Sequence, residues 1–157
     1  MTGWRIGYFA AEEQVATAAG RIQSHSTSNP SAPSQWASVE AIKHGESDVK
    51  GMIGEFANRR NTMVDGLNSI ENITCVKPDG AFYVFPNISQ CFGKSSEHGV
   101  ISNSVEFCEH LLKQQLVACV PGSGFGTDDY IRLSYATGMD DIQKGIERIK
   151  VFVDSLK

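Results

Sequence analysis

Arg132 is the residue whose type and setting first indicate chemistry. It lies in an alternating run, residues 130–136, in which Tyr130 and Ser134 share its face of a predicted strand. A guanidinium held on a strand offers a planar fork of donors that matches a carboxylate in bidentate geometry. The same pattern also suits an arginine that pairs with an acid on a solvent-exposed face. Spacing alone leaves carboxylate binding and a surface ion pair as two interpretations.

Three glycines, Gly122, Gly124 and Gly126, precede this strand. A glycine-rich loop can cradle a phosphate, but here a proline comes before the glycines, and neither a helix nor a Gly-Lys-Ser/Thr ending follows them. We therefore predict a tight turn leading into the Arg132 strand.

Composition limits the classes of function. The 157 residues carry a formal net charge of −4, and 41% of them are hydrophobic. The scattered basic residues argue against a nucleic-acid partner. No apolar run approaches the roughly 20 residues that cross a bilayer, and no signal peptide is visible. We expect a soluble cytoplasmic protein with no membrane partner, with an organelle as the alternative. The cysteines and histidines lack zinc-ligand spacing, so no metal site is predicted.

The first third of the chain should combine one strand with helices. Aromatic and β-branched residues predict a strand over residues 4–10, and an alanine-rich stretch predicts a helix over 11–19. The serines and prolines of residues 24–34 predict a loop. Apolar residues at helical spacing then predict a helix around Trp36 that breaks at Gly45, followed by a long helix over 47–69.

The remainder should alternate between short strands and helices. A capping serine, Ser102 or Ser104, and a capping box, Thr137 to Asp140, mark two helix starts. We predict strands over 73–76 and 81–85 joined by a turn at 77–80, a polar connection over 91–102, a helix over 103–115, strands over 116–120 and 130–136, and a final amphipathic helix. This order predicts the α/β class, as a two-layer α/β sandwich whose sheet need not be wholly parallel.

Four blocks of sequence carry a resemblance that spans the chain. The first reads Met-Thr-Gly-Trp-Arg-Ile-Gly-Tyr, and the others occupy residues 26–30, 78–85 and 120–136. In order and spacing they resemble the fold-type I, class I aminotransferases that depend on pyridoxal phosphate, in the bacterial-type aspartate aminotransferase branch. The first block is similar to the segment that follows the cofactor-binding lysine in that family.

The resemblance implies a fold and an activity. Residues 1–45 would form the end of the large, cofactor-binding domain, with a strand, short helices and an interface loop. Residues 46–157 would form the C-terminal small domain with its long linking helix. The parent enzyme would move an amino group between an aspartate-like amino acid and a 2-oxo acid. Pyridoxal 5'-phosphate would be its cofactor.

The resemblance also implies roles for individual residues. Arg5 would bind the cofactor phosphate, and Arg132 would hold the α-carboxylate of the substrate. Phe82 would border the substrate pocket, although a place in the sandwich core fits its pattern equally well. Ser28 and Asn29 would reach toward the other subunit of a homodimer, or they would simply form a turn closed by Asn-Pro.

No lysine in the chain stands in the family's Ser-Lys context, and the expected one would precede Met1 by four residues. We therefore expect no catalytic residue in this chain, and we expect the chain alone to bind no cofactor and to be inactive. Two alternatives stay open, which are a pyridoxal-phosphate-dependent lyase of the same fold and a non-catalytic binding module.

Overall fold

The structure, a computed structural model, describes residues 1–157 and separates into two compact units, Met1–Met52 and Ile53–Lys157. The long helix α3 (Glu46–Asn68) runs across the boundary between them. Each unit is described by itself below.

The first unit contains a short 3-10 helix η1 (Thr2–Trp4) and two helices, α1 (Glu13–Ser26) and α2 (Ala32–His44). The strand predicted over residues 4–10 is wrong, because these residues form no ladder with any other segment. Extended backbone becomes a strand only when a neighbouring strand takes up its N–H and C=O groups. Here the backbone turns instead, and Arg5 adopts a left-handed conformation with φ 50°.

The helices of this unit follow the local sequence signals, with different bounds. Helix α1 continues to Ser26, where the Ser26 hydroxyl donates to the Ile22 carbonyl at 2.7 Å, so the predicted loop shrinks to residues 27–31. The break at Gly45 is confirmed. A Cβ on Gly45 would lie 2.6 Å from the Ala41 carbonyl oxygen, which favours glycine at the end of α2.

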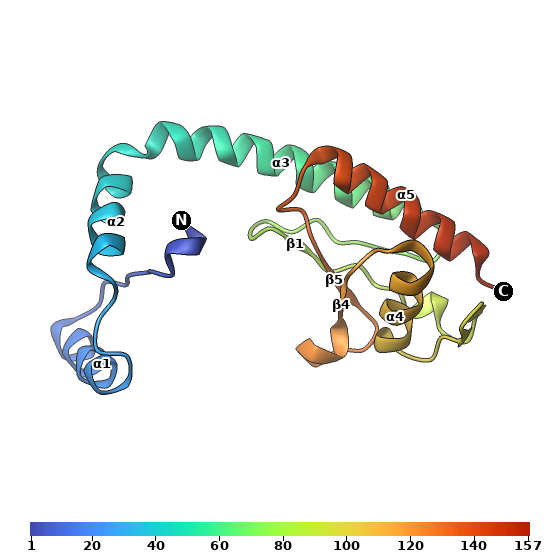
Figure 1. Cartoon of the computed structure of the whole chain (residues 1–157), viewed down its shortest axis with the longest axis horizontal. Helices are drawn as coiled ribbons and strands as arrows, with labels where there is room; N and C mark the ends of the chain where they lie inside the picture. Colours follow the sequence, from blue (N-terminus) through green and yellow to red (C-terminus); the bar gives the residue numbers. More distant parts are fainter. The chain divides into compact units, whose positions relative to one another are not determined.

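The second unit is built on a three-stranded antiparallel sheet in the order β1-β5-β4. Its strands are β1 (Tyr83–Val84), β4 (Val120–Pro121) and β5 (Ile131–Ser134), with β5 in the middle (Figure 1). The predicted alternation in β5 is confirmed, since Ile131 and Leu133 are buried while Arg132 is half-buried and Ser134 exposed. One face of the sheet therefore meets the core, and the other carries Arg132.

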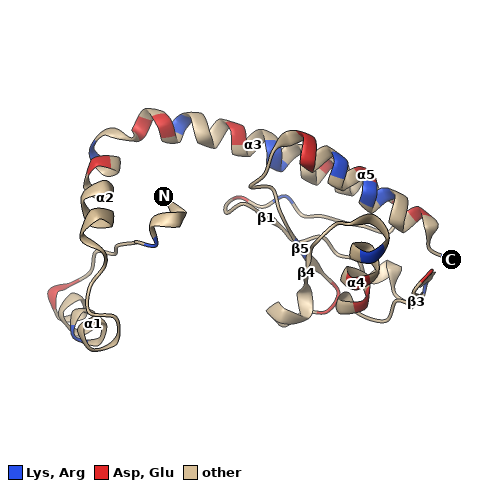
Figure 2. Ribbon diagram, in the orientation of Figure 1, with Lys and Arg blue, Asp and Glu red and all other residues tan.

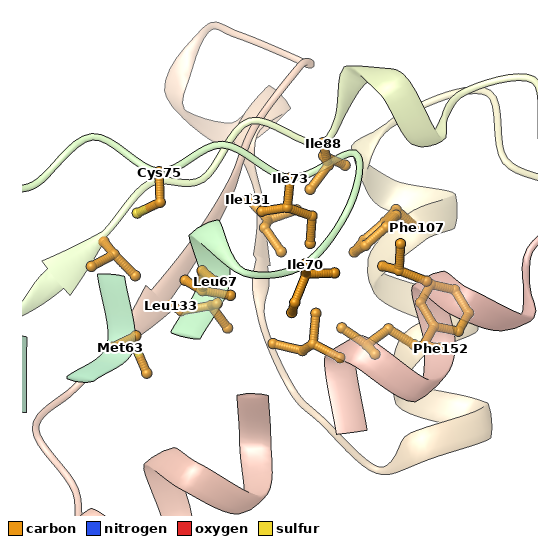
Figure 3. Packing of buried hydrophobic residues seen from close by; sticks show 14 of the residues in the cluster. Met63, Leu67, Ile70, Ile73, Cys75, Ile88, Phe107, Ile131, Leu133 and Phe152 are labelled. Atoms are coloured by element: carbon orange, nitrogen blue, oxygen red, sulfur yellow. The ribbon is translucent and has the colours of Figure 1, made fainter. Parts of the chain in front are cut away.

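Helices α4 (Ser104–Gln115) and α5 (Met139–Ser155) and the end of α3 form the second layer (Figure 1). Every buried hydrophobic residue of the chain lies between Met63 and Val153. Figure 3 shows Phe107 of α4 and Phe152 of α5 in this core, with ring centroids 5.3 Å apart and nearly perpendicular. The predicted two-layer α/β sandwich is confirmed.

Several local predictions for this unit are wrong in detail. Residues 91–102 include a small hairpin, β2 (Ser95–Ser96) and β3 (Gly99–Val100), where only a polar connection was predicted. Asn103, rather than a serine, caps α4 by accepting a hydrogen bond from the Glu106 N–H at 2.9 Å. The predicted strand over 116–120 narrows to β4, because Leu116 is left-handed, with φ 55°.

The capping box predicted at Thr137 is also absent. The N-cap of α5 is Gly138, and the Thr137 hydroxyl instead donates to the Asp141 carboxylate at 3.1 Å. The apolar stripe of this helix is confirmed, since Ile142, Ile149 and Val153 are buried.

Charges of both signs alternate along the helices, as Figure 2 shows for α3 and α5. All ion pairs in the structure join residues four apart on one helix, for example Lys150 and Asp154 at 2.6 Å. Such exposed pairs each contribute about 0.5 kcal/mol or less to helix stability. None of the helices has the combination of length and apolar character needed to cross a membrane.

Candidate functional site: an arginine set among aromatic rings

Arg132 lies on the central strand of the sheet, where neighbouring strands engage both edges. It is registered opposite Val120 of β4, and the next residue, Leu133, is registered opposite Val84 of β1. Its side chain makes no ion pair and no hydrogen bond within the chain. The interpretation of Arg132 as a surface ion pair is therefore wrong, and its guanidinium keeps its donors free for a carboxylate.

The Arg132 guanidinium is surrounded by aromatic rings instead of acids. Its Cζ atom lies 4.3 Å from the ring centroid of Tyr83 and 4.7 Å from that of Phe125. Phe125 meets Phe85 edge-on with centroids 6.0 Å apart, and Phe85 stacks on Tyr130 at 5.0 Å. No sequence pattern predicts that Tyr83 and Phe125 contact Arg132. Tyr83 reaches this face of the sheet because β1 and β5 pair in antiparallel register, with Tyr83 opposite Ser134.

The glycine-containing turn before β5 forms the 3-10 helix η3 (Gly122–Phe125), which confirms the predicted tight turn. The backbone N–H of Gly122 donates to the Tyr130 carbonyl at 2.8 Å, so the turn closes directly onto the start of the Arg132 strand. A Cβ on Gly122 would lie only 2.3 Å from the carbonyl oxygens of Thr127 and Tyr130. Glycine is required here for space, whereas Gly126 provides a positive φ of 83°.

We expect Gly122→Ala to lower the free energy of unfolding by about 1–3 kcal/mol, because the added methyl must displace backbone rather than a flexible side chain. Chemical unfolding followed by circular dichroism measures the change. Gly124→Ala is the matched control, since a Cβ at Gly124 meets nothing within 4 Å. Equal midpoints for the two variants would contradict the close-packed turn.

Arg5 lies in the first unit and is exposed. Its only side-chain hydrogen bond is a long one, from Nη1 to the Thr2 carbonyl at 3.4 Å. The segment around it is anchored through its neighbour, because the buried Ser34 hydroxyl donates to the Trp4 carbonyl at 3.1 Å. The guanidinium thus retains most of its donors and has no carboxylate partner, a donor set that suits a phosphate.

Phe82 is half-buried and packs against the hydrophobic core, while its ring lies 4.3 Å from that of Tyr83. Its carbonyl accepts a hydrogen bond from the Tyr135 N–H at 2.9 Å, and the Tyr135 hydroxyl donates to the Ala81 carbonyl at 2.8 Å. Phe82 therefore contributes to the core and also adjoins one of the rings around Arg132. Its contact with a substrate stays a prediction.

Ser28 and Asn29 form an exposed turn between α1 and α2. Ser28 has a positive φ of 65°, and the side chains of Asn29 and Gln35 both donate to the Pro30 carbonyl, at 3.3 and 2.9 Å. This geometry is that of the simple turn predicted as one alternative. A contact with a second subunit stays a prediction.

The four cysteines are free thiols, and Cys75, Cys91 and Cys108 are buried. Burial raises the pKa of Cys75 and of Cys91 to about 11, so both remain protonated near neutral pH and are poor nucleophiles. No group of three or more histidine, cysteine, aspartate or glutamate side chains is arranged to hold a metal ion. Arg5 and Arg132 are therefore the candidate functional residues of the chain.

Comparison with known proteins places this arrangement in a family. Residues 1–149 match the sequence profile of the aminotransferase class I and II family. The chain therefore belongs to the class I and II aminotransferases, as its sequence blocks indicated.

Particular relatives are aspartate aminotransferases. That of Bacillus subtilis (strain 168) is 42% identical over 154 residues, which cover 98% of this chain and 38% of the relative. The aspartate/prephenate aminotransferase of Nitrosomonas europaea is 41% identical over 95% of this chain and 38% of its own length. The crystal structure of the Rhizobium meliloti aspartate aminotransferase superposes with a TM-score of 0.92 and 40% identity, covering all of this chain and 40% of that one. The chain thus spans about two fifths of the length of these relatives.

Proposed function

We propose that this chain is the C-terminal part of a pyridoxal-phosphate-dependent aminotransferase that moves an amino group between an aspartate-like amino acid and a 2-oxo acid. The observation that carries the proposal is the unpaired guanidinium of Arg132 on the central strand of a chain in this family. A fixed fork of N–H donors orients an amino acid by its α-carboxylate and so presents its Cα–H bond to the reacting groups.

We further propose that residues 1–45 belong to the large domain and residues 46–157 to the small domain of the enzyme. The distribution of burial supports this division. The first unit exposes large apolar side chains, including Tyr8 at 82% and Trp36 at 75%, and buries no hydrophobic residue of its own. Such faces suit a segment that packs against further protein, and we propose that the turn at Ser28 and Asn29 lies at the interface of a homodimer.

Pyridoxal phosphate is the cofactor that the family implies, and its carbonyl and ring would supply the electron-withdrawing system that the reaction needs. The chain's own contribution is the Arg5 guanidinium. It is exposed, unpaired with any acid and bound internally only at 3.4 Å, so its donors fit a phosphate dianion. Arg5 would thus hold the phosphate and fix the position of the ring.

We expect Arg5→Leu to weaken binding of pyridoxal phosphate about 10- to 100-fold, since a hydrogen bond to a charged group contributes about 1.5–3 kcal/mol. Titration of the cofactor-free protein, expressed from its complete reading frame, measures the dissociation constant. Arg21→Leu is the matched control, because Arg21 is also exposed and unpaired in the same unit but lies on α1. Equal affinities for the two variants would contradict the role of Arg5.

The activity itself is tested with the same full-length protein. We expect transfer of the amino group of aspartate to 2-oxoglutarate. The formation of oxaloacetate from aspartate measures this transfer. A failure to use any 2-oxo acid as acceptor would overturn the proposal. Release of pyruvate from cystathionine in its place would indicate the lyase alternative, and neither reaction would indicate a binding module.

A further inference from the structure

The feature that the proposed function does not explain is the pair of rings against the Arg132 guanidinium. Tyr83 comes from β1 and Phe125 from η3, and their ring centroids lie 4.3 and 4.7 Å from Cζ. An arginine side chain is long and has many rotamers, only some of which aim its N–H fork at a given point. Contact with two ring faces leaves the Arg132 side chain far fewer accessible rotamers.

Both rings are themselves held in place. Phe125 meets Phe85 edge-on, and Phe85 stacks on Tyr130 with an interplanar angle of 5°. Tyr83 lies on a strand paired with β5, opposite Ser134. Neighbouring rings and strand pairing therefore fix the positions of both rings, although Phe125 itself remains 48% exposed.

A hydrogen-bond network also fixes the turn that carries Phe125. The Ser104 hydroxyl donates to the Asp128 carboxylate at 2.6 Å and accepts a hydrogen bond from the Ser123 N–H at 3.3 Å. Ser104 is fully buried at the start of α4, so the network ties η3 to the helix layer. The position of Phe125 beside Arg132 thus follows from the fold.

Rings can orient a guanidinium in a way that an acid cannot. An aromatic face attracts the cation through its quadrupole while leaving every N–H available. A carboxylate at the same place would occupy those donors and neutralise the charge, and so it would compete with a carboxylate ligand. The absence of any acid paired with Arg132 fits this requirement.

We propose that Tyr83 and Phe125 are positioning residues, which hold the Arg132 guanidinium by ring-face contact so that its N–H fork is ready for the substrate carboxylate. This role rests on the proposed function, in which Arg132 binds that carboxylate. The rings touch neither substrate nor cofactor in this role, and they act through Arg132.

The test uses the full-length protein loaded with pyridoxal phosphate. We expect Phe125→Leu and Tyr83→Leu each to raise KM for aspartate about 3- to 20-fold, with kcat changed much less, because a cation–π contact is lost while charge and volume are nearly kept. The dissociation constant of maleate, a dicarboxylate that does not react, should rise by a similar factor. Because Phe125 is half-exposed, its replacement by leucine leaves the core intact.

Conservative variants and a second background separate positioning from structural damage. Tyr83→Phe and Phe125→Tyr keep a ring face, and we expect KM within about twofold of wild type. In an Arg132→Leu background the leucine variants should have no further effect on maleate binding, because residues that act through a shared partner are not additive.

The possible results of these measurements bear separately on the positioning role and on the proposed function. An active wild type whose KM and maleate affinity are unchanged by Phe125→Leu and Tyr83→Leu would overturn the positioning role alone. Additive effects in the Arg132→Leu background would overturn it as well, since they would show that the rings act independently of Arg132. A wild type with no aminotransferase activity would overturn the proposed function, and the positioning role with it.

Discussion

Arg132→Leu is expected to lower kcat/KM for aspartate about 100- to 1,000-fold in the full-length enzyme. Loss of one partner from a charged, hydrogen-bonded pair costs about 2–5 kcal/mol, and each 1.4 kcal/mol is a factor of ten. The expected loss lies inside this range. Because Arg132 forms no internal hydrogen bond or ion pair, the variant loses no such contact from its fold. Steady-state kinetics with saturating 2-oxoglutarate measure the effect.

The control for this variant is Arg148→Leu, which removes the same charge from α5, where Arg148 likewise makes no ion pair. We expect its kcat/KM to stay close to that of wild type. If Arg132→Leu also stayed within threefold of wild type, Arg132 would not be the carboxylate-binding residue, and the proposed reaction would lose its main support.

The second large effect concerns stability. We expect Phe107→Ala to lower the free energy of unfolding by about 3–5 kcal/mol, the usual cost of removing a buried aromatic ring. Phe107 is 0% exposed and packs edge-on against Phe152, so its removal opens a cavity between α4 and α5 (Figure 3). Denaturant unfolding followed by circular dichroism measures the loss.

Leu112→Ala, on the same helix but 47% exposed, provides the comparison for Phe107→Ala. Its effect should stay below about 1 kcal/mol, as is usual for exposed positions. A loss for Phe107→Ala as small as that for Leu112→Ala would mean that α4 does not contribute its buried face to the core.

The helices were predictable because their signals are local. The predicted bounds of the long helix α3 agree with the structure to within one residue at each end. The apolar stripe predicted for α5 matches the buried face of that helix. Both follow from apolar residues spaced three and four apart, a pattern that needs no knowledge of distant segments. The break at Gly45 was predictable for the same reason.

Strands were less predictable because they depend on partners. Residues 4–10 have strand-forming side chains but no neighbouring strand, so they stay irregular. The converse holds for β2 and β3, whose serines and glycine have low strand propensity yet pair across a tight turn. Propensity describes the side chains, whereas a ladder requires a second segment at the right place.

The same contrast between local signals and signals that need a partner segment applies to the candidate site. Arg132 could be singled out from its own strand pattern, and the family resemblance suggested its role. Its contact with Tyr83 could not be predicted without the register of β1 and β5, and Phe125 lies in a turn with no periodic signal. The candidate carboxylate-binding residue was therefore visible in the sequence, while the rings that contact it emerged only from the fold.

The central position of β5 has a consequence for how the site responds to thermal motion. A strand bonded on both edges exchanges its amide hydrogens only when the sheet opens as a whole, whereas turns and chain ends open locally and often. Arg132 therefore stands on one of the least fluctuating parts of the molecule. The conformational entropy of this backbone is lost during folding. Binding of a ligand to the guanidinium therefore does not have to order the backbone that carries it.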